Sequence, residues 1–318
     1  MNPRSWQSVS LSDEGMPISN PSGLVERFEL KECWNPDTDL SQKSTLGVGV
    51  VTDLYFEPDD LGDLHRIRAL SNHRSCPLTV VGGGSNVVFT EEASEHVLVE
   101  LSGESFQAVD IRTVEDQYRI RAGSGKQLPV LVRNAVDAGW YTFGRLTGIP
   151  GTVGGAVHGN SGTRMGEIGE FVDSVHVLHP DRPETVCRSE PEFGYRSSNL
   201  HDEIVISVEF SGENRPDDQE NPPHEEIQSR RMQTQPISER SAGCMFKNPE
   251  DDSAGRLIDE AGLKGHRVGQ ARVSTEHANF LVNEGGAEPG DVLQLMQTIR
   301  ERVDSEYGID LEPEVRVI

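Results

Sequence analysis

The clearest hydrophobic pattern in the chain lies near its C-terminal end. Apolar residues recur there at the spacing of one helical face, at Val292, Leu295, Met296, Ile299 and Val303. Steps of three or four residues place such side chains on one side of an α-helix. Pro289 lies just upstream, and proline is favoured at the first helical position because its missing N–H would have no intrahelical partner. The pattern predicts a long helix that begins near Pro289 and buries one face.

Shorter apolar runs between glycines predict strands that alternate with helices. Residues 106–114 and 117–121 have the pattern of a hairpin, and the helical spacing of 128–138 ends at Gly139, a typical C-cap residue. Further predicted strands and helices cover 46–56, 61–70, 78–81, 172–178, 204–210, 225–233, 253–261 and 311–318. This mixture predicts a folded α+β protein, and the chain contains no internal repeat.

Two polar stretches interrupt these elements. Residues 1–40 are rich in Ser, Asp, Asn and Pro, and they predict a loose N-terminal extension. Residues 211–226, SGENRPDDQENPPHEE, combine proline with acidic residues and predict a domain boundary. With 318 residues the chain has the length of two or three domains. We expect one region over 41–212, with parts at about 41–100 and 101–212, and a second domain over 213–318.

Charge narrows the classes of partner. The formal net charge is −24, which repels nucleic-acid phosphates and anionic membrane surfaces, so neither is expected as a partner. Only five of the 29 basic residues are lysine. A strongly acidic surface with little lysine indicates either hydration in a concentrated-salt cytosol or ordinary acidic drift, and the sequence leaves both open. Lysines within motif-like segments, Lys247 and Lys264, gain interest from this scarcity.

The four cysteines, Cys33, Cys76, Cys187 and Cys244, are widely spaced and form no CxxC pair. This spacing argues against a zinc site or a disulfide framework, and we expect no metal and a reducing compartment. The chain has no run of about 18 apolar residues and no apolar core behind a basic N-terminus. We therefore expect a cytoplasmic protein.

The first segment with candidate chemistry is VVGGGSN, residues 80–86, in which an apolar strand leads into three glycines and two small polar residues. Such a turn can point several backbone N–H groups at one phosphate. An ordinary strand-to-loop turn is an equally good interpretation of the glycine triplet alone. The segment matches neither GxGxxG nor GxxxxGK[ST], which disfavours nicotinamide-binding Rossmann domains and P-loop hydrolases.

The second segment is TGIPGTVGGAVHGNSG, residues 147–162, which contains six glycines and one proline. Backbone so poor in side chains can lie flat against a large planar ligand. Apolar residues such as Ile149, Val153 and Val157 stand between the glycines, whereas a merely flexible loop would not need them. Ligand contact is the favoured interpretation, and a tightly packed crossing of two sheets is the alternative.

Three polar candidates are weaker when taken alone. Arg196, in FGYRSS, could clamp a carboxylate or phosphate, although a lone arginine in a loop is more often part of a surface ion pair. Cys244, in SAGCMFKNP, is more often a small buried residue, but with an ordinary pKa of about 8.5 its thiol could donate a proton at neutral pH. Glu312 and Glu314, in LEPEVR, are two apart and would share one strand face, so that one could approach a site while the other stays solvated.

Taken together, the motifs carry more information than any one of them. GGGSN, TGIPGTVGGAV, FGYRSS, SAGCMFKNP, AGLKG and a terminal LEPEVR occur in one order over about 44–318. In this order the chain closely resembles the UDP-N-acetylenolpyruvoylglucosamine reductases, also called UDP-N-acetylmuramate dehydrogenases. The resemblance implies an α+β fold with an FAD-binding domain of the vanillyl-alcohol-oxidase (PCMH) type and a smaller α+β substrate-binding domain, whose last strand returns to the active site.

The resemblance implies an NADPH- and FAD-dependent oxidoreductase of peptidoglycan precursor synthesis, and thus of cell-wall biogenesis, cell shape and division. NADPH reduces the flavin and leaves. The enolpyruvyl ether of UDP-N-acetylglucosamine then takes hydride on its methylene carbon and a proton on the neighbouring carbon, which gives UDP-N-acetylmuramate. Negative charge develops on the substrate carboxylate during this addition, so a cation and an acid must be directed there. The sequence does not give the oligomeric state, and we expect a monomer.

Roles for individual residues are implied by the same motifs. Arg196 would bind the substrate carboxylate, Cys244 would deliver the proton, and Glu314 would assist from the opposite side. The residues expected to hold FAD are Gly82, Gly83, Gly84, Ser85, Asn86, Gly148, Ile149, Pro150, Gly151, Thr152, Gly154, Gly155 and Val157. Those expected to contact the sugar nucleotide are Tyr195, Lys247, Asn248, Lys264 and His277. The short spacing from Arg196 to Cys244 places the chain in the compact branch of the family.

The chain departs from the family pattern at three places. The proton donor is usually serine, but here it is Cys244, which predicts a site sensitive to alkylation and oxidation. The stretch WYTFGRLTGIP lacks the usual acidic residue before the glycine motif, and Ser44 replaces the usual asparagine before Thr45. The last two changes affect the expected FAD contacts.

Two other functions remain as alternatives at this stage. An FAD-dependent oxidase of the same fold would pass electrons to oxygen, and the trio of Arg196, Cys244 and Glu314 speaks against it. A catalytically silent sugar-nucleotide-binding or scaffold protein would not need the flavin loop, which is intact here.

Overall fold

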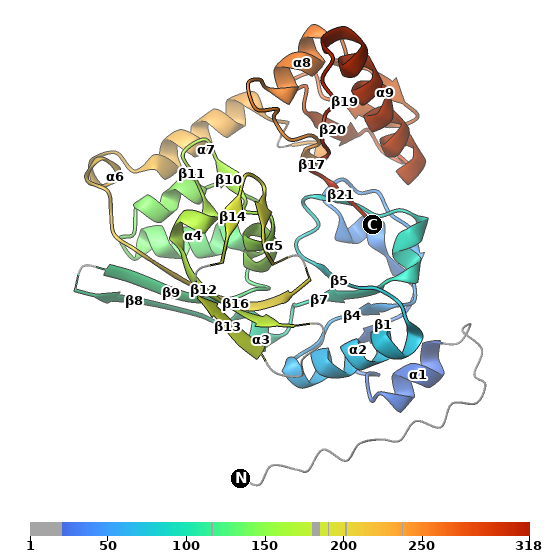
Figure 1. Ribbon diagram of the computed structural model, residues 1–318, viewed down its shortest axis with the longest axis vertical. Coiled ribbons are helices and arrows are strands. Elements are labelled where there is room, and N and C mark those ends of the chain that lie inside the picture. The colour runs from blue at the N-terminus through green and yellow to red at the C-terminus, as the bar shows by residue number, and fades with distance from the viewer. Residues whose placement is uncertain (1–20, 116, 180–184, 190, 201, 237) are drawn as a thin grey trace.

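The computed structural model describes residues 21–115, 117–179, 185–189, 191–200, 202–236 and 238–318. These residues form three parts, each built around a β-sheet: an N-terminal part (21–101), a central part (102–236) and a C-terminal part (238–318). Figure 1 shows the C-terminal part, in orange and red, above the other two. The sequence-based domain limits at 100/101 and 212/213 stay predictions.

The N-terminal part is a small sheet covered by helices. Its elements are α1 (Pro21–Arg27), β1 (Trp34–Asn35), β2 (Thr38–Asp39), β3 (Val51–Thr52), β4 (Tyr55–Phe56), α2 (Leu61–Arg74), β5 (Leu78–Val81), β6 (Val87–Val88) and β7 (Val97–Glu100). The main sheet has the order β1-β4-β7-β5, and β7 is parallel to both β4 and β5. Val97 and Val99 face the core shared with α1 and α2, while Leu98 faces the opposite side, as the alternation of a strand requires.

Residues 21–40 are part of this fold, which corrects the prediction of a loose extension through residue 40. Residues 1–20 lie outside the described residues. Val25, Leu30, Cys33 and Leu40 are buried, and α1 packs beside α2. The few apolar residues of this polar stretch are therefore spaced to reach the core, and its composition alone conceals that.

The central part is an antiparallel sheet with α4 and α5 packed on one face. Its elements are α3 (Glu104–Gln107), β8 (Val109–Val114), β9 (Gln117–Gly123), α4 (Leu128–Asp137), α5 (Val153–His158), β10 (Gly162–Thr163), β11 (Gly166–Glu167), β12 (Val172–Leu178), β13 (Thr185–Ser189), β14 (Phe193–Gly194), β15 (Ser197–Ser198), β16 (Ile204–Gly212), α6 (Pro216–Glu220) and α7 (Pro223–Thr234). The order is β13-β12-β16-β9-β8, so the predicted β8/β9 hairpin and the predicted strand over 172–178 are confirmed. Trp140, Phe143 and Phe171 fill the core between helices and sheet.

The acidic, proline-rich segment after β16 is fixed to the central part. Asp218 is buried, and both its carboxylate oxygens accept hydrogen bonds from Arg145, at 2.8 and 2.9 Å. The side chain of Asn214 donates to the carbonyl of Gly139 at 2.7 Å, and Thr142 accepts from the N–H of Arg215. These contacts attach a segment that has few apolar residues to the central part. They give α7 a fixed starting point.

The C-terminal part is an antiparallel sheet covered by α8 and α9. Its elements are β17 (Arg240–Cys244), α8 (Ala254–Glu260), β18 (Arg267–Val268), β19 (Ala271–Val273), β20 (Phe280–Asn283), α9 (Pro289–Tyr307) and β21 (Arg316–Val317). The sheet order is β17-β20-β19-β18. The predicted long helix is confirmed: α9 begins at Pro289, and Val292, Leu295, Met296, Ile299 and Val303 are all buried on one face.

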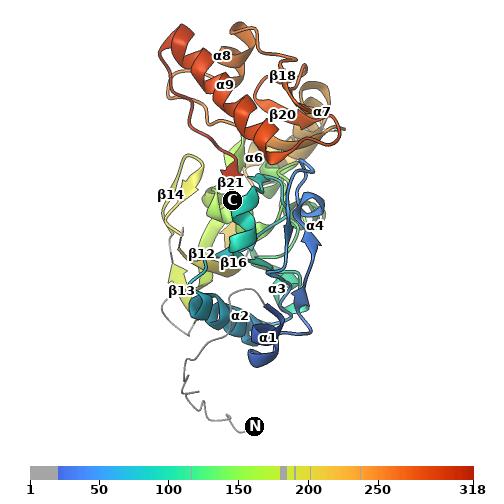
Figure 2. The same cartoon turned by 90° about the vertical axis from the view of Figure 1, so that its right-hand side faces the viewer.

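The chain crosses between parts at two places. Leu46 and Val48 of the N-terminal part belong to the core of the C-terminal part. In return, β21 leaves the C-terminal part and pairs in parallel with β6, with Arg316 opposite Val87. Figures 1 and 2 show β21 between the C-terminal helices and the N-terminal sheet. Of the strand predicted over 311–318, only Arg316–Val317 is regular, and Pro313 makes an isolated bridge to Phe246.

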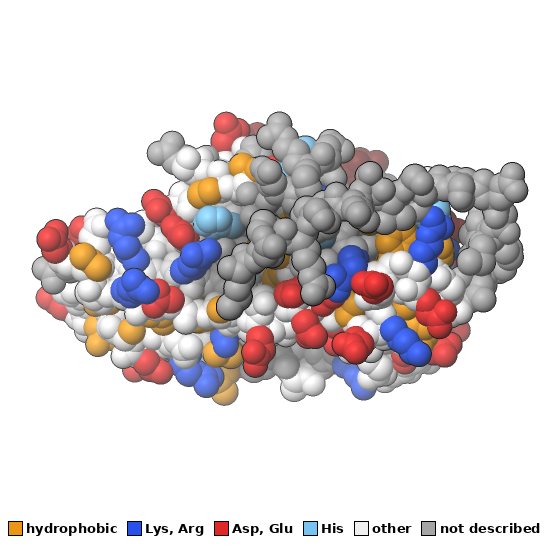
Figure 3. Space-filling model, turned by 90° about the horizontal axis from the view of Figure 1, so that it is seen from below, with side chains coloured by type: hydrophobic (Ala, Val, Ile, Leu, Met, Phe, Trp, Pro, Cys, Tyr) orange, Lys and Arg blue, Asp and Glu red, His pale blue; other side chains and the backbone are white. Residues whose placement is uncertain are grey.

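The described surface carries charge of both signs. Figure 3 shows acidic and basic side chains interspersed on the face seen from below. Within the described ranges, no helix is both long enough and apolar enough to span a bilayer.

Candidate active site

All three parts contribute residues to a cavity of about 1170 Å³. The N-terminal part supplies the glycine loop 82–86, and the central part supplies Ser124, residues 150–155 and Arg196. The C-terminal part supplies Lys247 and residues 313–316. Typical pockets for drug-sized ligands are about 300–1,000 Å³, so this cavity has room for a dinucleotide.

The two glycine segments predicted from the sequence pack against each other, and both line this cavity. A Cβ on Gly83 would lie 2.7 Å from Cα of Gly151, and one on Gly82 would lie 2.7 Å from Oγ1 of Thr152. Gly84 has φ +62°, and a Cβ there would lie 1.9 Å from the carbonyl oxygen of Lys43. Side chains are therefore excluded at these positions for steric reasons, and the exposed backbone forms a cradle, which we call the glycine wall (82–86 and 150–155).

Ten of the thirteen predicted FAD residues line the cavity, and three do not. Gly82, Gly83, Gly84, Ser85, Asn86, Pro150, Gly151, Thr152, Gly154 and Gly155 all line the cavity. Val157 and Ile149 are instead buried in the core of the central part. Gly148 has φ +82° and lies beneath Arg231.

The glycine wall fits a phosphate-bearing planar group. The Ser124 hydroxyl lines the cavity and is buried, and within the described chain its oxygen has no hydrogen-bond partner. A buried polar atom without a partner is costly unless a ligand or water satisfies it. The backbone cradle and this unpartnered hydroxyl are therefore compatible with bound FAD.

The same cavity is lined by a set of charged side chains, which we call the charged wall: Arg196, Lys247 and Glu314. Nε of Arg196 lies 3.1 Å from Oε1 of Glu314, and Nη2 donates to the carbonyl of Gly162 at 3.2 Å. Nε itself has no acceptor in hydrogen-bond geometry within the described residues. Arg196 has φ +53°, which is unusual for a residue with a side chain and occurs mostly where a turn must present that side chain. Because Nε has no hydrogen-bond acceptor, the guanidinium can still donate hydrogen bonds to a carboxylate.

Glu314 is held near this cation in a partly buried position. Burial raises the pKa of its carboxyl, and the charges of Arg196 and Lys247 lower it by less. Glu312 lies on the solvent side, where it pairs with Lys247 at 2.6 Å. The prediction that one of the two carboxylates approaches a site while the other stays solvated agrees with this arrangement.

Cys244 ends β17 beside the charged wall. Gly243 has φ +75°, and the register of β17 against β20 shifts between Ser241 and Cys244. Burial, followed by the charge of Glu314, raises the pKa of the Cys244 thiol to about 12, against the smaller opposing effects of Arg196 and Arg231. The thiol is therefore protonated over the whole neutral range.

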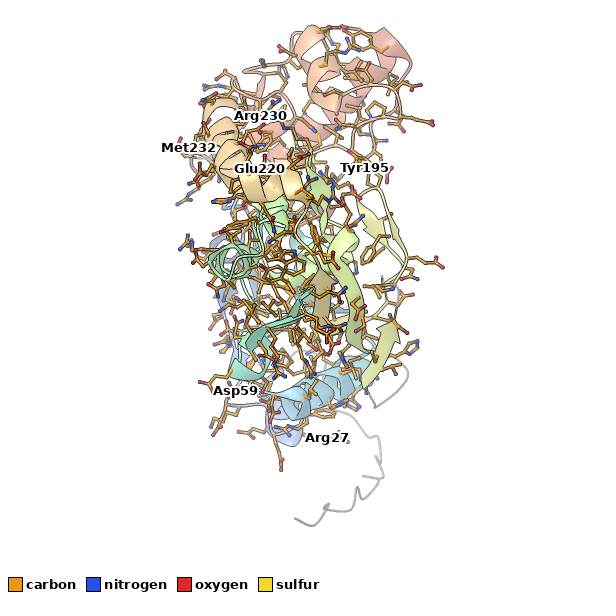
Figure 4. The ribbon with its side chains drawn as sticks, turned by 90° about the vertical axis from the view of Figure 1, so that its left-hand side faces the viewer. Arg27, Asp59, Tyr195, Glu220, Arg230 and Met232 are labelled. Atoms are coloured by element: carbon orange, nitrogen blue, oxygen red, sulfur yellow. The ribbon has the colours of Figure 1, made fainter. Side chains whose placement is uncertain are left out.

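Three of the predicted substrate residues gather at a smaller pocket of about 230 Å³ next to the charged wall. Tyr195, Lys247 and Asn248 line it together with Glu312. The Tyr195 hydroxyl accepts a hydrogen bond from the N–H of Asn248 at 3.4 Å, and its ring is half-exposed at the base of the C-terminal part (Figure 4). Oδ1 of Asn248 accepts from the N–H of Ala254, the first residue of α8, whereas Ser253 at the N-cap position makes no side-chain cap hydrogen bond.

The other two predicted substrate residues lie elsewhere in the C-terminal part. Lys264 pairs with Asp259 at 2.6 Å, and His277 packs against the ring of Phe280. Burial and then the charge of Lys264 lower the pKa of His277, which places the two side chains near each other. Neither lines the two cavities described above.

Sequence reasoning missed two basic residues near the site. Arg231 of α7 lies over Gly148, where a Cβ would be 2.6 Å from its Cδ, and burial lowers its pKa. Helix α7 is mostly polar, so no hydrophobic periodicity marks Arg231 as the residue that faces the site. Figure 4 shows its neighbours in sequence, Arg230 and Met232, on the same helix. Lys43 lies beneath Gly84, and its amine bonds Glu57 and Glu100 at 2.8 Å each. The scarcity of lysine in the chain was the only feature of the sequence that could have drawn attention to Lys43.

Comparisons with known proteins agree with this geometry. Residues 52–182 match the FAD binding domain model, and residues 235–318 match the model of the UDP-N-acetylenolpyruvoylglucosamine reductase C-terminal domain. The predicted FAD-binding region and mixed α and β class are thereby confirmed.

Full-length relatives carry the same family name. UDP-N-acetylenolpyruvoylglucosamine reductase 2 of Symbiobacterium thermophilum is 36% identical over 87% of this chain and 90% of its own. The reductase of Thermus thermophilus is 40% identical over 87% of this chain and 97% of its own. The crystal structure of the reductase from Thermus caldophilus has a TM-score of 0.74 and 38% identity, covering 88% of this chain and 97% of that one. The chain therefore belongs to the UDP-N-acetylenolpyruvoylglucosamine reductase family.

Proposed function

We propose that this protein is an FAD-dependent reductase that uses NADPH to convert UDP-N-acetylglucosamine enolpyruvate to UDP-N-acetylmuramate, a step of peptidoglycan precursor synthesis. The observation that carries the proposal is one cavity that is lined both by a glycine-rich backbone cradle and by a partly buried arginine–glutamate pair. The cradle suits a flavin dinucleotide, and the pair suits a carboxylate at which negative charge develops.

The overall reaction is balanced by NADPH and one proton. The enol ether gains hydride at its methylene carbon and a proton at the carbon next to its carboxylate, and NADP⁺ is released. When bound on the glycine wall, FAD supplies the hydride transfer from NADPH to the substrate.

The charged wall binds and polarises the substrate. Arg196 presents its guanidinium to the substrate carboxylate, where it disperses the negative charge that develops after hydride arrives. Glu314 holds the guanidinium in place through its ion pair with Nε of Arg196, and burial raises the pKa of this carboxyl.

Cys244 supplies the proton. Because its pKa is raised to about 12, the thiol carries its proton throughout the neutral range, and transfer to carbon leaves a thiolate that regains a proton from solvent. The charges of Arg196 and Arg231 stabilise that thiolate, which limits the cost of the transfer.

The sugar nucleotide extends from the charged wall toward the smaller pocket. Tyr195, Lys247 and Asn248 border that pocket and offer an aromatic ring, an ammonium and an amide. Lys264 and His277, which lie farther within the C-terminal part, would act only after a movement of that part, and their roles remain part of the proposal.

The proposal also includes a monomeric, cytoplasmic enzyme. All four cysteines are free thiols, one of them exposed at Cys187, and this favours a reducing compartment. Sedimentation velocity on the holoenzyme would test the monomeric state.

The direct test uses the holoenzyme without oxygen. NADPH should bleach the bound flavin, and UDP-N-acetylglucosamine enolpyruvate should restore its colour rapidly before any oxygen is admitted. Colour that returns only with oxygen would favour an oxidase of the same fold. A purified protein without bound flavin would contradict both enzyme functions.

A further inference from the structure

Asn86, the last residue of the glycine loop, is bonded to the chain segment that carries Glu314. Its side-chain amide donates to the carbonyl of Glu314 at 3.0 Å, across a separation of 228 residues in sequence. The N–H of Arg316 donates back to the carbonyl of Asn86 at 3.1 Å. The amide nitrogen of the Asn86 side chain thus has its acceptor within the chain, whereas the sequence assigned this residue to FAD.

Glu314 is held from its other side by the residues that follow Cys244. The N–H of Glu314 donates to the carbonyl of Met245 at 2.7 Å, and that of Val315 donates to the same oxygen at 3.3 Å. Lys247 donates its N–H to the carbonyl of Glu312 at 2.9 Å. The backbone of Glu314 therefore lies between the cofactor loop and the strand of the proton donor.

This position of the backbone determines where the carboxylate can reach. The side chain of Glu314 must extend to Nε of Arg196 at 3.1 Å, in a partly buried setting where a small displacement is not compensated by water. Misplacing a catalytic group by about 1 Å can lower a rate about 100-fold. Regular strand pairing does not begin until Arg316, so Glu314 depends on these individual hydrogen bonds.

We propose that Asn86 is a positioning residue that couples the glycine loop 82–86 to Glu314. Its side-chain amide fixes the carbonyl of Glu314, so that the loop which holds the cofactor also sets the carboxylate opposite Arg196. This inference rests on the proposed function for its kinetic readout, but the coupling itself is a property of the chain.

The kinetic test compares the two half-reactions in holoenzyme variants. In Asn86→Ala, anaerobic reoxidation of the flavin by UDP-N-acetylglucosamine enolpyruvate should fall about 10- to 100-fold, whereas flavin reduction by NADPH should fall much less. Asn86→Asp keeps the size of the side chain but cannot donate, and the same selective loss is expected. A normal rate of reoxidation in Asn86→Asp would overturn the proposal, as would loss of bound FAD with both half-reactions reduced in proportion.

Asn283→Ala is the matched control. Asn283 also uses its side-chain amide to join two parts, because it donates to the carbonyls of Leu46 and Gly47 at 3.0 Å each. It lies outside both cavities. Its loss should lower thermal stability without favouring one half-reaction over the other, and a selective loss of reoxidation equal to that of Asn86→Ala would overturn the proposal.

Hydrogen exchange provides a readout that does not depend on activity. In Asn86→Ala, the amides of Glu314 and Val315 should exchange faster, while that of Ile318, which donates to the carbonyl of Val88, should be unchanged. Unchanged exchange at Glu314 and Val315 would contradict the coupling. If the wild-type enzyme failed to oxidise its reduced flavin with the sugar nucleotide, the proposed function would fail while this exchange test would still decide the coupling.

Discussion

The two walls of the cavity are built on different principles. The glycine wall is made of backbone, and its positions exclude a Cβ because other backbone atoms lie within 1.9–2.7 Å of where it would be at Gly83 and Gly84. The charged wall is made of side chains from segments far apart in sequence, around Arg196 and Glu314. The first wall is fixed by steric exclusion, and the second by electrostatics and a few hydrogen bonds. Substitutions in the two walls should therefore fail in different ways.

The largest effect is expected in the glycine wall. Gly84→Ala places a Cβ against the carbonyl of Lys43 at a residue with φ +62°, so the loop must move and the variant should retain no FAD. Gly290→Ala is the control, because nothing lies within 4 Å of its added Cβ, and it should keep full occupancy. The flavin absorbance of the purified proteins measures this, and a fully yellow Gly84→Ala protein would contradict the steric account.

The next effect is expected in the alkylation rate of Cys244, whose thiol lies beside the charged wall. Alkylating agents react with the thiolate, and burial raises the pKa of the Cys244 thiol to about 12, so its alkylation at pH 8 should be much slower than that of an exposed thiol. Cys187 is exposed and is the internal control. This expectation differs from the alkylation-sensitive site predicted from the sequence, because burial was not visible there. Mass spectrometry of peptides after timed alkylation measures both rates, and equal rates would show that the thiol is not buried as described.

A smaller loss is expected when the charged wall loses its cation without steric change. Arg196→Met should still bind FAD and accept electrons from NADPH, while kcat with the enolpyruvyl substrate should fall about 100-fold or more. Arg164→Met is the control, since Arg164 pairs with Glu226 on the surface and should leave kcat unchanged. If Arg196→Met instead lost its flavin, the two walls would not be separable.

The smallest effect is expected in the thermal stability of the whole protein as the salt concentration changes. The net charge of −24 creates self-repulsion that salt screens, so raising KCl from about 0.1 to about 1 M should raise Tm by a few degrees. Exposed ion pairs such as Arg302–Glu306 weaken at the same time but contribute little. A Tm that falls with KCl, measured on holoenzyme by differential scanning calorimetry, would mean that local pairs outweigh the overall repulsion.

The difference between the walls also explains what the sequence could predict. Two local motifs predict the glycine wall, and a local hydrophobic periodicity predicts α9, so both can be recognised from short stretches of sequence. The approach of Glu314 to Arg196 requires the chain end to cross between parts, which the motifs imply only through resemblance. The bond from Asn86 to Glu314 and the inward turn of Arg231 depend on long-range packing, and no local pattern marks them. Residues 21–40 were misjudged because a polar average hides four well-placed apolar side chains, Val25, Leu30, Cys33 and Leu40.

The central claim is that the glycine wall holds the FAD that transfers hydride, while Cys244, beside the charged wall, supplies the proton. Anaerobic stopped-flow measurements on Cys244→Ala and Cys244→Ser test it most directly. The account predicts that NADPH reduces the flavin in both variants at nearly the wild-type rate, that substrate reoxidises it about 100- to 10,000-fold more slowly in Cys244→Ala, and that Cys244→Ser stays active. Rapid reoxidation in Cys244→Ala, with product formed, would contradict the claim.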